Sequence, residues 1–100
     1  MNVMHTVEMT YLFSKWMDDL RDLTARDRVL ARIILVQRGN IGKTNRVGGG
    51  VFELKINYGP GYRLYFINKA GKIILLLCGG DKNSQKRDIK LAIELAKQEV

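Results

Sequence analysis

Charged and phenolic side chains recur at alternate positions in two neighbouring segments that have the pattern of strands. Glu53 and Lys55 alternate with apolar residues in the first segment, and Arg63 and Tyr65 share one face of the second. On adjacent antiparallel strands these side chains stand side by side, and Lys82 follows just beyond a third strand. Lysine and arginine on a rigid sheet suit phosphoryl chemistry, because they stabilise negative charge on phosphate oxygens without a metal. Cross-strand ion pairing of Glu53 with Lys55 or Arg63 is the alternative interpretation.

A stretch of cations precedes these strands. No acidic residue occurs from position 28 to position 52, a window that contains Arg28, Arg32, Arg38, Lys43 and Arg46. The chain carries 17 basic and 10 acidic residues, a net charge of +7, and the excess is shared between its two halves. This pattern favours a polyanionic partner, which could be RNA, DNA or an acidic protein. A solvated helix face is the alternative interpretation of the same residues.

Counts of histidine and cysteine limit the possible chemistry. His5 is the only histidine and Cys78 the only cysteine, so a histidine acid–base pair, an intrachain disulfide and a cysteine-based zinc site are excluded. We therefore expect no metal and no cofactor. Three aspartates near the first helix are interpreted as its solvated face rather than as a carboxylate site: Asp18, Asp19 and Asp22.

Length and composition predict a single cytoplasmic domain over residues 1–100. Hydrophobic residues make up 46% of the chain and charged residues 27%, a composition typical of globular domains. No apolar stretch reaches the roughly 18 to 20 residues that cross a bilayer, and the first residues lack a secretory pattern. A lone cysteine is also typical of a reducing compartment.

Hydrophobic periodicity predicts the helices that support the candidate site. Apolar spacing of i, i+4 predicts a helix from Tyr11, with Thr10 as its N-cap and Trp16 in the core. A second helix is expected to have Thr24 as its N-cap, to end before Arg38 and to pack against the first helix as a hairpin. A C-terminal helix is expected around the apolar positions Ile89, Ala92, Ile93 and Ala96.

Alternation and turn residues predict the sheet. Residues 3–9 alternate imperfectly and predict a short opening strand, the five glycines of 39–50 predict a mobile loop, and 79–83 are expected to form a turn. Three meandering antiparallel strands are expected over 51–57, 62–68 and 72–78. The fold class is therefore α+β, with an N-terminal helical hairpin and a C-terminal helix packed on an antiparallel sheet of about four strands.

The two faces of this sheet are expected to differ. Leu54 and Leu64 belong to the face that packs on helices, whereas Glu53 and Arg63 belong to a face that is expected to be open to solvent or substrate. On this interpretation, Arg63→Ala changes the free energy of unfolding by no more than about 1 kcal/mol.

Several segments resemble the RelE/HigB-like killer proteins of bacterial toxin–antitoxin addiction modules. The resemblance covers nearly the whole chain and is carried by Phe13-Ser14-Lys15-Trp16, by Gly39-Asn40-Ile41-Gly42, and by the runs GGGVFELKINYGPGYRLYF over 48–66 and LLLCGGDKNSQKRDI over 75–89. It implies a RelE/ParE-type domain, in which helices flank an antiparallel sheet.

The resemblance also implies an activity and its residues. Family members cleave mRNA in the ribosomal A site by attack of the RNA 2′-hydroxyl on the adjacent phosphate, and an antitoxin encoded by an adjacent gene neutralises them. Arg63 matches the family's phosphate-binding strand arginine, Lys55 matches a catalytic strand lysine, and Lys82 lies where a second cation is usual. On this interpretation the stretch of cations from 28 to 46 contacts RNA or the ribosome.

Two departures from the family pattern affect the site. Glu53 stands where the best-known RelE toxins have a second strand lysine, and Asp88 lies near the position of their C-terminal tyrosine. Glu53 is itself a candidate general base, although the neighbouring cations would weaken it in that role. ParE toxins share the fold and poison DNA gyrase instead of cutting RNA, so a gyrase poison without nuclease activity is the alternative function. A nucleic-acid-binding module that is not toxic is a third hypothesis.

Overall fold

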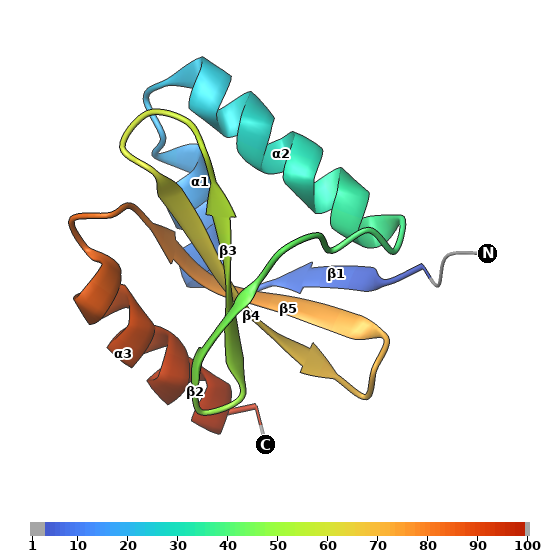
Figure 1. The fold of residues 1–100 in the computed structure, drawn as a ribbon. Helices are drawn as coiled ribbons and strands as arrows, with labels where there is room; N and C mark the ends of the chain where they lie inside the picture. The colour runs from blue at the N-terminus through green and yellow to red at the C-terminus, as the bar shows by residue number, and fades with distance from the viewer. Residues whose placement is uncertain (1–3, 100) are drawn as a thin grey trace.

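A five-stranded mixed sheet forms the centre of the computed structural model, which describes residues 4–99 (Figure 1). The strand order is β1-β5-β4-β3-β2; β1 runs parallel to β5 and the other neighbours are antiparallel. The strands are β1 (Thr6–Met9), β2 (Asn45–Gly48), β3 (Val51–Ile56), β4 (Tyr62–Lys69) and β5 (Ile73–Gly80). The helices are α1 (Tyr11–Asp18), α2 (Leu23–Gln37) and α3 (Gln85–Lys97). The predicted α+β class is confirmed. The sheet has one strand more than expected and is mixed rather than antiparallel, because β1 pairs parallel with β5.

The N-cap predicted for α1 is confirmed. Thr10 Oγ1 accepts a hydrogen bond from the Phe13 backbone N–H at 3.1 Å and donates to the carbonyl of Leu77 at 2.6 Å. The first bond satisfies a backbone donor at the start of the helix. The second ties the start of α1 to β5, so the cap also fixes the helix on the sheet.

The N-cap predicted for α2 is wrong. The cap is Asp22, whose Oδ1 accepts hydrogen bonds from the backbone N–H groups of Thr24 and Ala25 at 3.0 and 3.2 Å. A carboxylate satisfies two donors and suits the positive end of the helix dipole, so it prevails over the nearby Thr24 hydroxyl. Asp22 is exposed, as expected, but it caps α2 and does not belong to the first helix. Asp18 and Asp19 are exposed, as expected, and form surface ion pairs with Arg26 and Lys15.

Helices cover both faces of the sheet (Figure 1). On one face, α1 and α2 pack Phe13, Met17, Val29, Ile33 and Val36 against Leu54, Ile56, Leu64, Phe66, Ile74 and Leu76. On the other face, α3 packs Ala92 and Ala96 against Val51, Tyr65, Leu75, Leu77 and Cys78. Two small alanines let α3 approach the sheet closely, and β5 is apolar on both faces because it lies between two layers of helices.

Two segments differ from the elements expected of them. The predicted loop 39–50 contains β2, which pairs with β3 and turns back through Gly49 and Gly50, both at positive φ. Alternation over only four residues does not stand out among so many glycines, which explains the omission. The expected turn 79–83 begins later, because Gly79 and Gly80 complete β5. A side chain at Gly79 would collide with the ring of Trp16, so the half-buried tryptophan packs directly on the strand backbone.

The opening strand is shorter than predicted. β1 begins at Thr6, and the expected first strand residue, Val3, lies outside the described residues. His5 precedes the strand, and its backbone N–H donates to the carbonyl of Gln37 at the end of α2. No helix within residues 4–99 is long and apolar enough to cross a membrane.

Cys78 provides a test of the packing between β5 and α3. Burial raises the pKa of its thiol from 9.0 to about 12, with a further contribution from the charge of Asp88. As the pH rises, the thiol ionises in the unfolded chain before it ionises in the folded chain. The contribution of the buried neutral thiol to the stability of the fold is therefore complete below pH 9 and is lost as the pH rises towards 12. We expect this residue to lower the free energy of unfolding by up to about 1.4 kcal/mol per pH unit in that range.

Urea unfolding of the wild type and of Cys78→Ala at several pH values between 8 and about 11 measures this effect. Titration of other groups is common to both proteins, so the difference between their slopes isolates the thiol. Equal slopes would contradict burial of Cys78 under α3.

Candidate functional site

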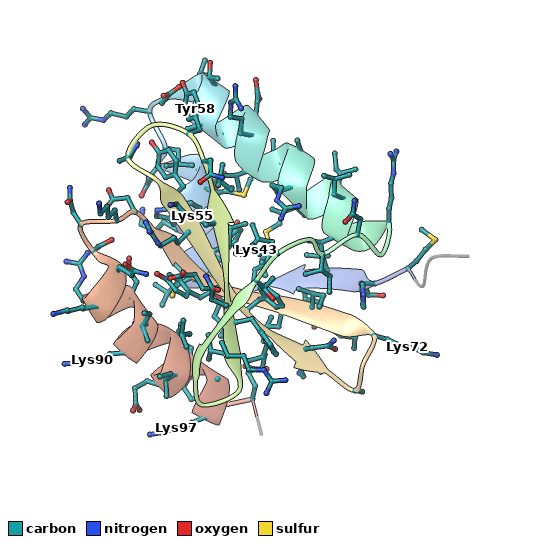
Figure 2. The ribbon with its side chains drawn as sticks, in the orientation of Figure 1. Lys43, Lys55, Tyr58, Lys72, Lys90 and Lys97 are labelled. Carbon is teal, nitrogen blue, oxygen red and sulfur yellow. The ribbon has the colours of Figure 1, made fainter. Side chains whose placement is uncertain are left out.

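Three predicted cations, Lys55, Arg63 and Lys82, lie together beside the β3–β4 turn. Figure 2 labels Lys55 on this part of the molecule. Lys55 on β3 is directly opposite Arg63 on β4, and the backbone N–H of Lys82 donates to the carbonyl of Pro60 in the turn at 3.4 Å. The side chains of the three cations line one hollow of about 340 Å³ with the turn residues 57–61. Strand alternation and a short loop after β5 thus bring together positions that are up to 27 residues apart in the chain.

A second, larger hollow of about 770 Å³ lies between α2 and β3. Its cations are Arg28 and Arg32, one turn apart on α2, together with Lys43 and Lys55. Lys55 and Asn57 line both hollows, so the two form one continuous surface. We call it the basic groove and define it by Arg28, Arg32, Lys43, Lys55, Arg63 and Lys82. Within residues 4–99, no carboxylate lines either hollow, so the groove is suited to a polyanion.

Contacts hold two of the groove arginines in place. The guanidinium of Arg28 lies 4.7 Å from the centroid of the Tyr58 ring, and the Tyr58 hydroxyl donates to Asp22 Oδ2 at 3.0 Å. Arg32 Nη2 donates to the carbonyl of Ile41 at 3.1 Å. Side chains that are already held in place lose less conformational entropy when a phosphate binds, so their affinity for phosphate is higher.

Arg38 and Arg46 lie apart from the groove. Arg38 is the exposed C-cap of α2, and the guanidinium of Arg46 on β2 lies 5.5 Å from the centroid of the Phe52 ring. Neither lines the two hollows. The predicted five-residue stretch of cations therefore divides into three groove residues and two outlying ones.

Glu53, Arg63 and Tyr65 do not lie on an open face, contrary to the sequence prediction. Glu53 is 5% exposed, Arg63 is 7% exposed and Tyr65 is fully buried, because α3 covers this side of the sheet. The pattern along a strand defines its two faces but not which other element packs on each face. Burial, together with the negative charge of Glu53, raises the pKa of Tyr65 above its usual value, so its hydroxyl stays protonated.

The buried charges form an ion pair, as the alternative interpretation proposed. Arg63 Nε lies 3.7 Å from Glu53 Oε2, and the same oxygen accepts a hydrogen bond from Gln85 Nε2 at 2.8 Å. Arg63 Nη1 donates to the carbonyl of Gly61 at 2.8 Å. Glu53 does not line the basic groove whereas Arg63 does, which favours a structural role for Glu53 over a role as general base.

Asp88 does not line the hollow of the three cations. It is buried in the first turn of α3, where Ser84 Oγ donates to its Oδ2. It lines a separate hollow with Trp16, and a side chain at Gly80 would collide with its carboxylate. The position that the resemblance compares with a family tyrosine is therefore occupied here by a buried helix-start carboxylate.

Sequence analysis missed two residues of this region. Tyr58 carries a signal, because it is an aromatic residue next to a Pro-Gly turn between two strand cations. Gln85 carries no such signal, because it is 32 positions from Glu53 and no repeating sequence pattern indicates that the two residues are in contact.

Comparison with known proteins identifies the family. Residues 15–100 match the family described as Phage derived protein Gp49-like. The chain belongs to this family. An uncharacterised protein of Haemophilus influenzae is similar to the Gp49-like chain, with 44% identity over 92 residues that cover 92% of this chain and 93% of that protein.

Solved structures with the same fold come from Escherichia coli. A mutant of the toxin RelE in the free state has a TM-score of 0.71 at 15% identity and covers 97% of this chain and 98% of its own. A chain of the intact RelBE toxin–antitoxin complex has a TM-score of 0.60 at 18% identity, with coverage of 77% and 95%. The RelE-type fold that the sequence resemblance implied for the Gp49-like chain is confirmed.

Proposed function

We propose that the Gp49-like chain is the toxin of a toxin–antitoxin pair and that it cleaves mRNA on the ribosome without a metal or a cofactor. The observation that carries this proposal is the meeting of Lys55, Arg63 and Lys82 in one hollow that is continuous with a groove free of carboxylates. The similarity of the fold to the toxin RelE supports it.

The three cations suit cleavage by an internal nucleophile. The 2′-oxygen of the RNA forms a bond to phosphorus, the bond to the 5′-oxygen of the next nucleotide breaks, the 2′-hydroxyl proton leaves to a base, and the 5′-oxygen takes up a proton. Arg63 is assigned to the non-bridging phosphate oxygens, because guanidinium donors match their geometry. Lys55 and Lys82 are assigned to the negative charge that develops around the phosphorus.

The wider part of the groove is assigned to the RNA backbone. Replacement of Arg28 with alanine should remove one phosphate contact, so the slope of log affinity against log salt should become less steep by about 0.7 for single-stranded RNA. Fluorescence anisotropy with a labelled single-stranded RNA between about 50 and 200 mM salt measures this slope. The matched control is Arg38→Ala, which lies outside the groove and should leave the slope unchanged. Equal slopes for both variants would remove Arg28 from the RNA-binding surface.

An antitoxin is the proposed protein partner. The chain has a net charge of +7, which favours an inhibitor of complementary charge, and the RelBE complex supplies a structural precedent for such a pair. We place the gene of the antitoxin next to the gene of this chain. Growth arrest upon expression of the chain alone, and its relief by co-expression of the neighbouring gene, would support this partner; uninterrupted growth would contradict it.

Mapping of mRNA ends on translating ribosomes tests the activity. Purified chain added to programmed ribosomes should produce new 5′ ends within the codon in the A site, and Lys55→Ala should not. Intact mRNA and continuing translation during growth arrest would overturn the proposal. Inhibition of DNA supercoiling together with DNA damage signalling would then indicate that the chain is a gyrase poison. If expression of the chain causes no growth arrest, the chain is a nucleic-acid-binding module that is not toxic.

A further inference from the structure

The carboxylate of Glu53 joins Arg63 to the first residue of α3. Its Oε2 accepts a hydrogen bond from Gln85 Nε2 at 2.8 Å and lies 3.7 Å from Arg63 Nε. Exposed fractions of the Glu53 and Arg63 side chains are 6% and 9%. Among the described residues, Arg63 Nε has no hydrogen-bond partner, so this ion pair is its main polar contact. A buried carboxylate without its partners lowers the stability of the fold, so the side chains of Glu53, Arg63 and Gln85 depend on one another.

Two contacts fix the orientation of the Arg63 guanidinium. Glu53 faces its Nε edge, and the carbonyl of Gly61 accepts from Nη1 at 2.8 Å. A side chain on Gly61 would lie 3.3 Å from Nη1, so glycine allows the turn to approach the guanidinium closely. A guanidinium has five N–H donors, and within residues 4–99 the only hydrogen bond from the Arg63 Nη groups is the one to Gly61, so the other Nη donors can bind a ligand in the hollow that Arg63 lines.

The loop before α3 places Lys82 and Gln85 together. Asp81 Oδ1 accepts hydrogen bonds from the backbone N–H groups of Asn83 and Ser84 at 2.9 and 3.2 Å. This turn directs Lys82 to the hollow and brings Gln85, the first residue of α3, to Glu53. The start of α3 is thereby connected to two of the three cations in the hollow.

We infer that Gln85 and Glu53 are positioning residues for Arg63: Gln85 holds the Glu53 carboxylate, and Glu53 aims the Arg63 guanidinium into the basic groove. This inference rests on the proposed function of Arg63 in cleavage. It gives Glu53 a role that needs no contact with substrate and makes the first turn of α3 part of the site. A displacement of about 1 Å in a catalytic group can reduce a rate by about 10²-fold, so a single hydrogen bond remote from the substrate can matter.

The Gln85→Ala variant is the main test, because Gln85 is half-buried and its removal leaves the apolar core intact. In single-turnover cleavage on programmed ribosomes, we expect the rate at saturating ribosome concentration to fall by about 10-fold. The ribosome concentration at half-saturation should stay the same, because the cations that contact RNA remain. Gln98→Ala, at the exposed C-cap of α3, is the matched control and should cleave as the wild type does.

A second readout does not depend on cleavage. The Arg63 Nε–Hε signal in a ¹H–¹⁵N NMR spectrum is identified as the one that is missing in Arg63→Lys. In Gln85→Ala it should shift and exchange with solvent faster, and in Gln98→Ala it should not. If the wild type cleaves, an unchanged rate in folded Gln85→Ala overturns the inference. If the wild type does not cleave, the proposed function fails, and the NMR signal alone decides whether Gln85 positions Arg63.

Discussion

Replacement of Arg63 with alanine should both weaken the fold and abolish most of the mRNA cleavage. Glu53 would remain buried without its cationic partner, a change that typically lowers the free energy of unfolding by about 3–5 kcal/mol. The sequence-based limit of about 1 kcal/mol assumed an open face and is replaced by this value. Loss of a donor aimed at the reacting phosphate should reduce the cleavage rate by about 10²–10³-fold.

The Arg63→Lys variant separates these two effects. Lysine keeps a positive charge beside Glu53, so most of the stability should return, but it lacks the planar fork that binds a phosphate through two donors. Urea unfolding and single-turnover cleavage on programmed ribosomes, measured on both variants, provide the comparison. If Arg63→Lys unfolds like the wild type and also cuts at its rate, the guanidinium has no specific part in the reaction.

Loss of the Lys55 side chain should give the second large effect, and this effect should concern activity alone. Lys55 is exposed, so Lys55→Ala should change the free energy of unfolding by no more than about 0.5 kcal/mol. It lines both hollows of the basic groove, so its removal should reduce cleavage by about 10²–10³-fold. Lys82→Ala should weaken cleavage as well, because Lys82 lines the same hollow.

Lys72 supplies the control for this prediction. It is also an exposed lysine, but it lies in the turn between β4 and β5, far from Lys55 and Tyr58 in Figure 2. Lys72→Ala should cut mRNA at the wild-type rate and change net charge by the same amount as Lys55→Ala. Equal losses in the two variants would mean that the overall charge, and not the hollow, determines activity.

Local patterns in the sequence were enough to predict most elements of the fold. Apolar spacing predicted α1 from Tyr11, and alternation predicted the strands that became β3, β4 and β5. β2 was not predicted because its four residues, which end in Gly48, are too few for an alternating pattern to be detected. The cap of α2 was misplaced because Asp22 and Thr24 are both suitable residues, and only the three-dimensional course of the chain decides between them.

The candidate site was predictable where it depends on strand pairing and not where it depends on tertiary packing. Alternation predicted that Lys55 and Arg63 would lie side by side, and the register confirms it. The burial of Arg63 follows from the packing of α3, and the contact of Gln85 with Glu53 joins residues from distant elements. Contacts between distant elements leave no repeating pattern in the sequence, so they could not be predicted from it.

The parallel pairing of β1 with β5 affects how the chain folds during its own synthesis. The side chain of Thr10 bonds to the carbonyl of Leu77, 67 positions later. At roughly 5 to 20 residues per second, about 3 to 13 s pass between the synthesis of these two residues. Until β5 emerges, β1 has no neighbour and β4 lacks one of its two. A nascent chain that stops before Ile73 therefore lacks both β5, which joins β1 to β4, and the loop that carries Lys82, so the complete groove can form only after both have been synthesised.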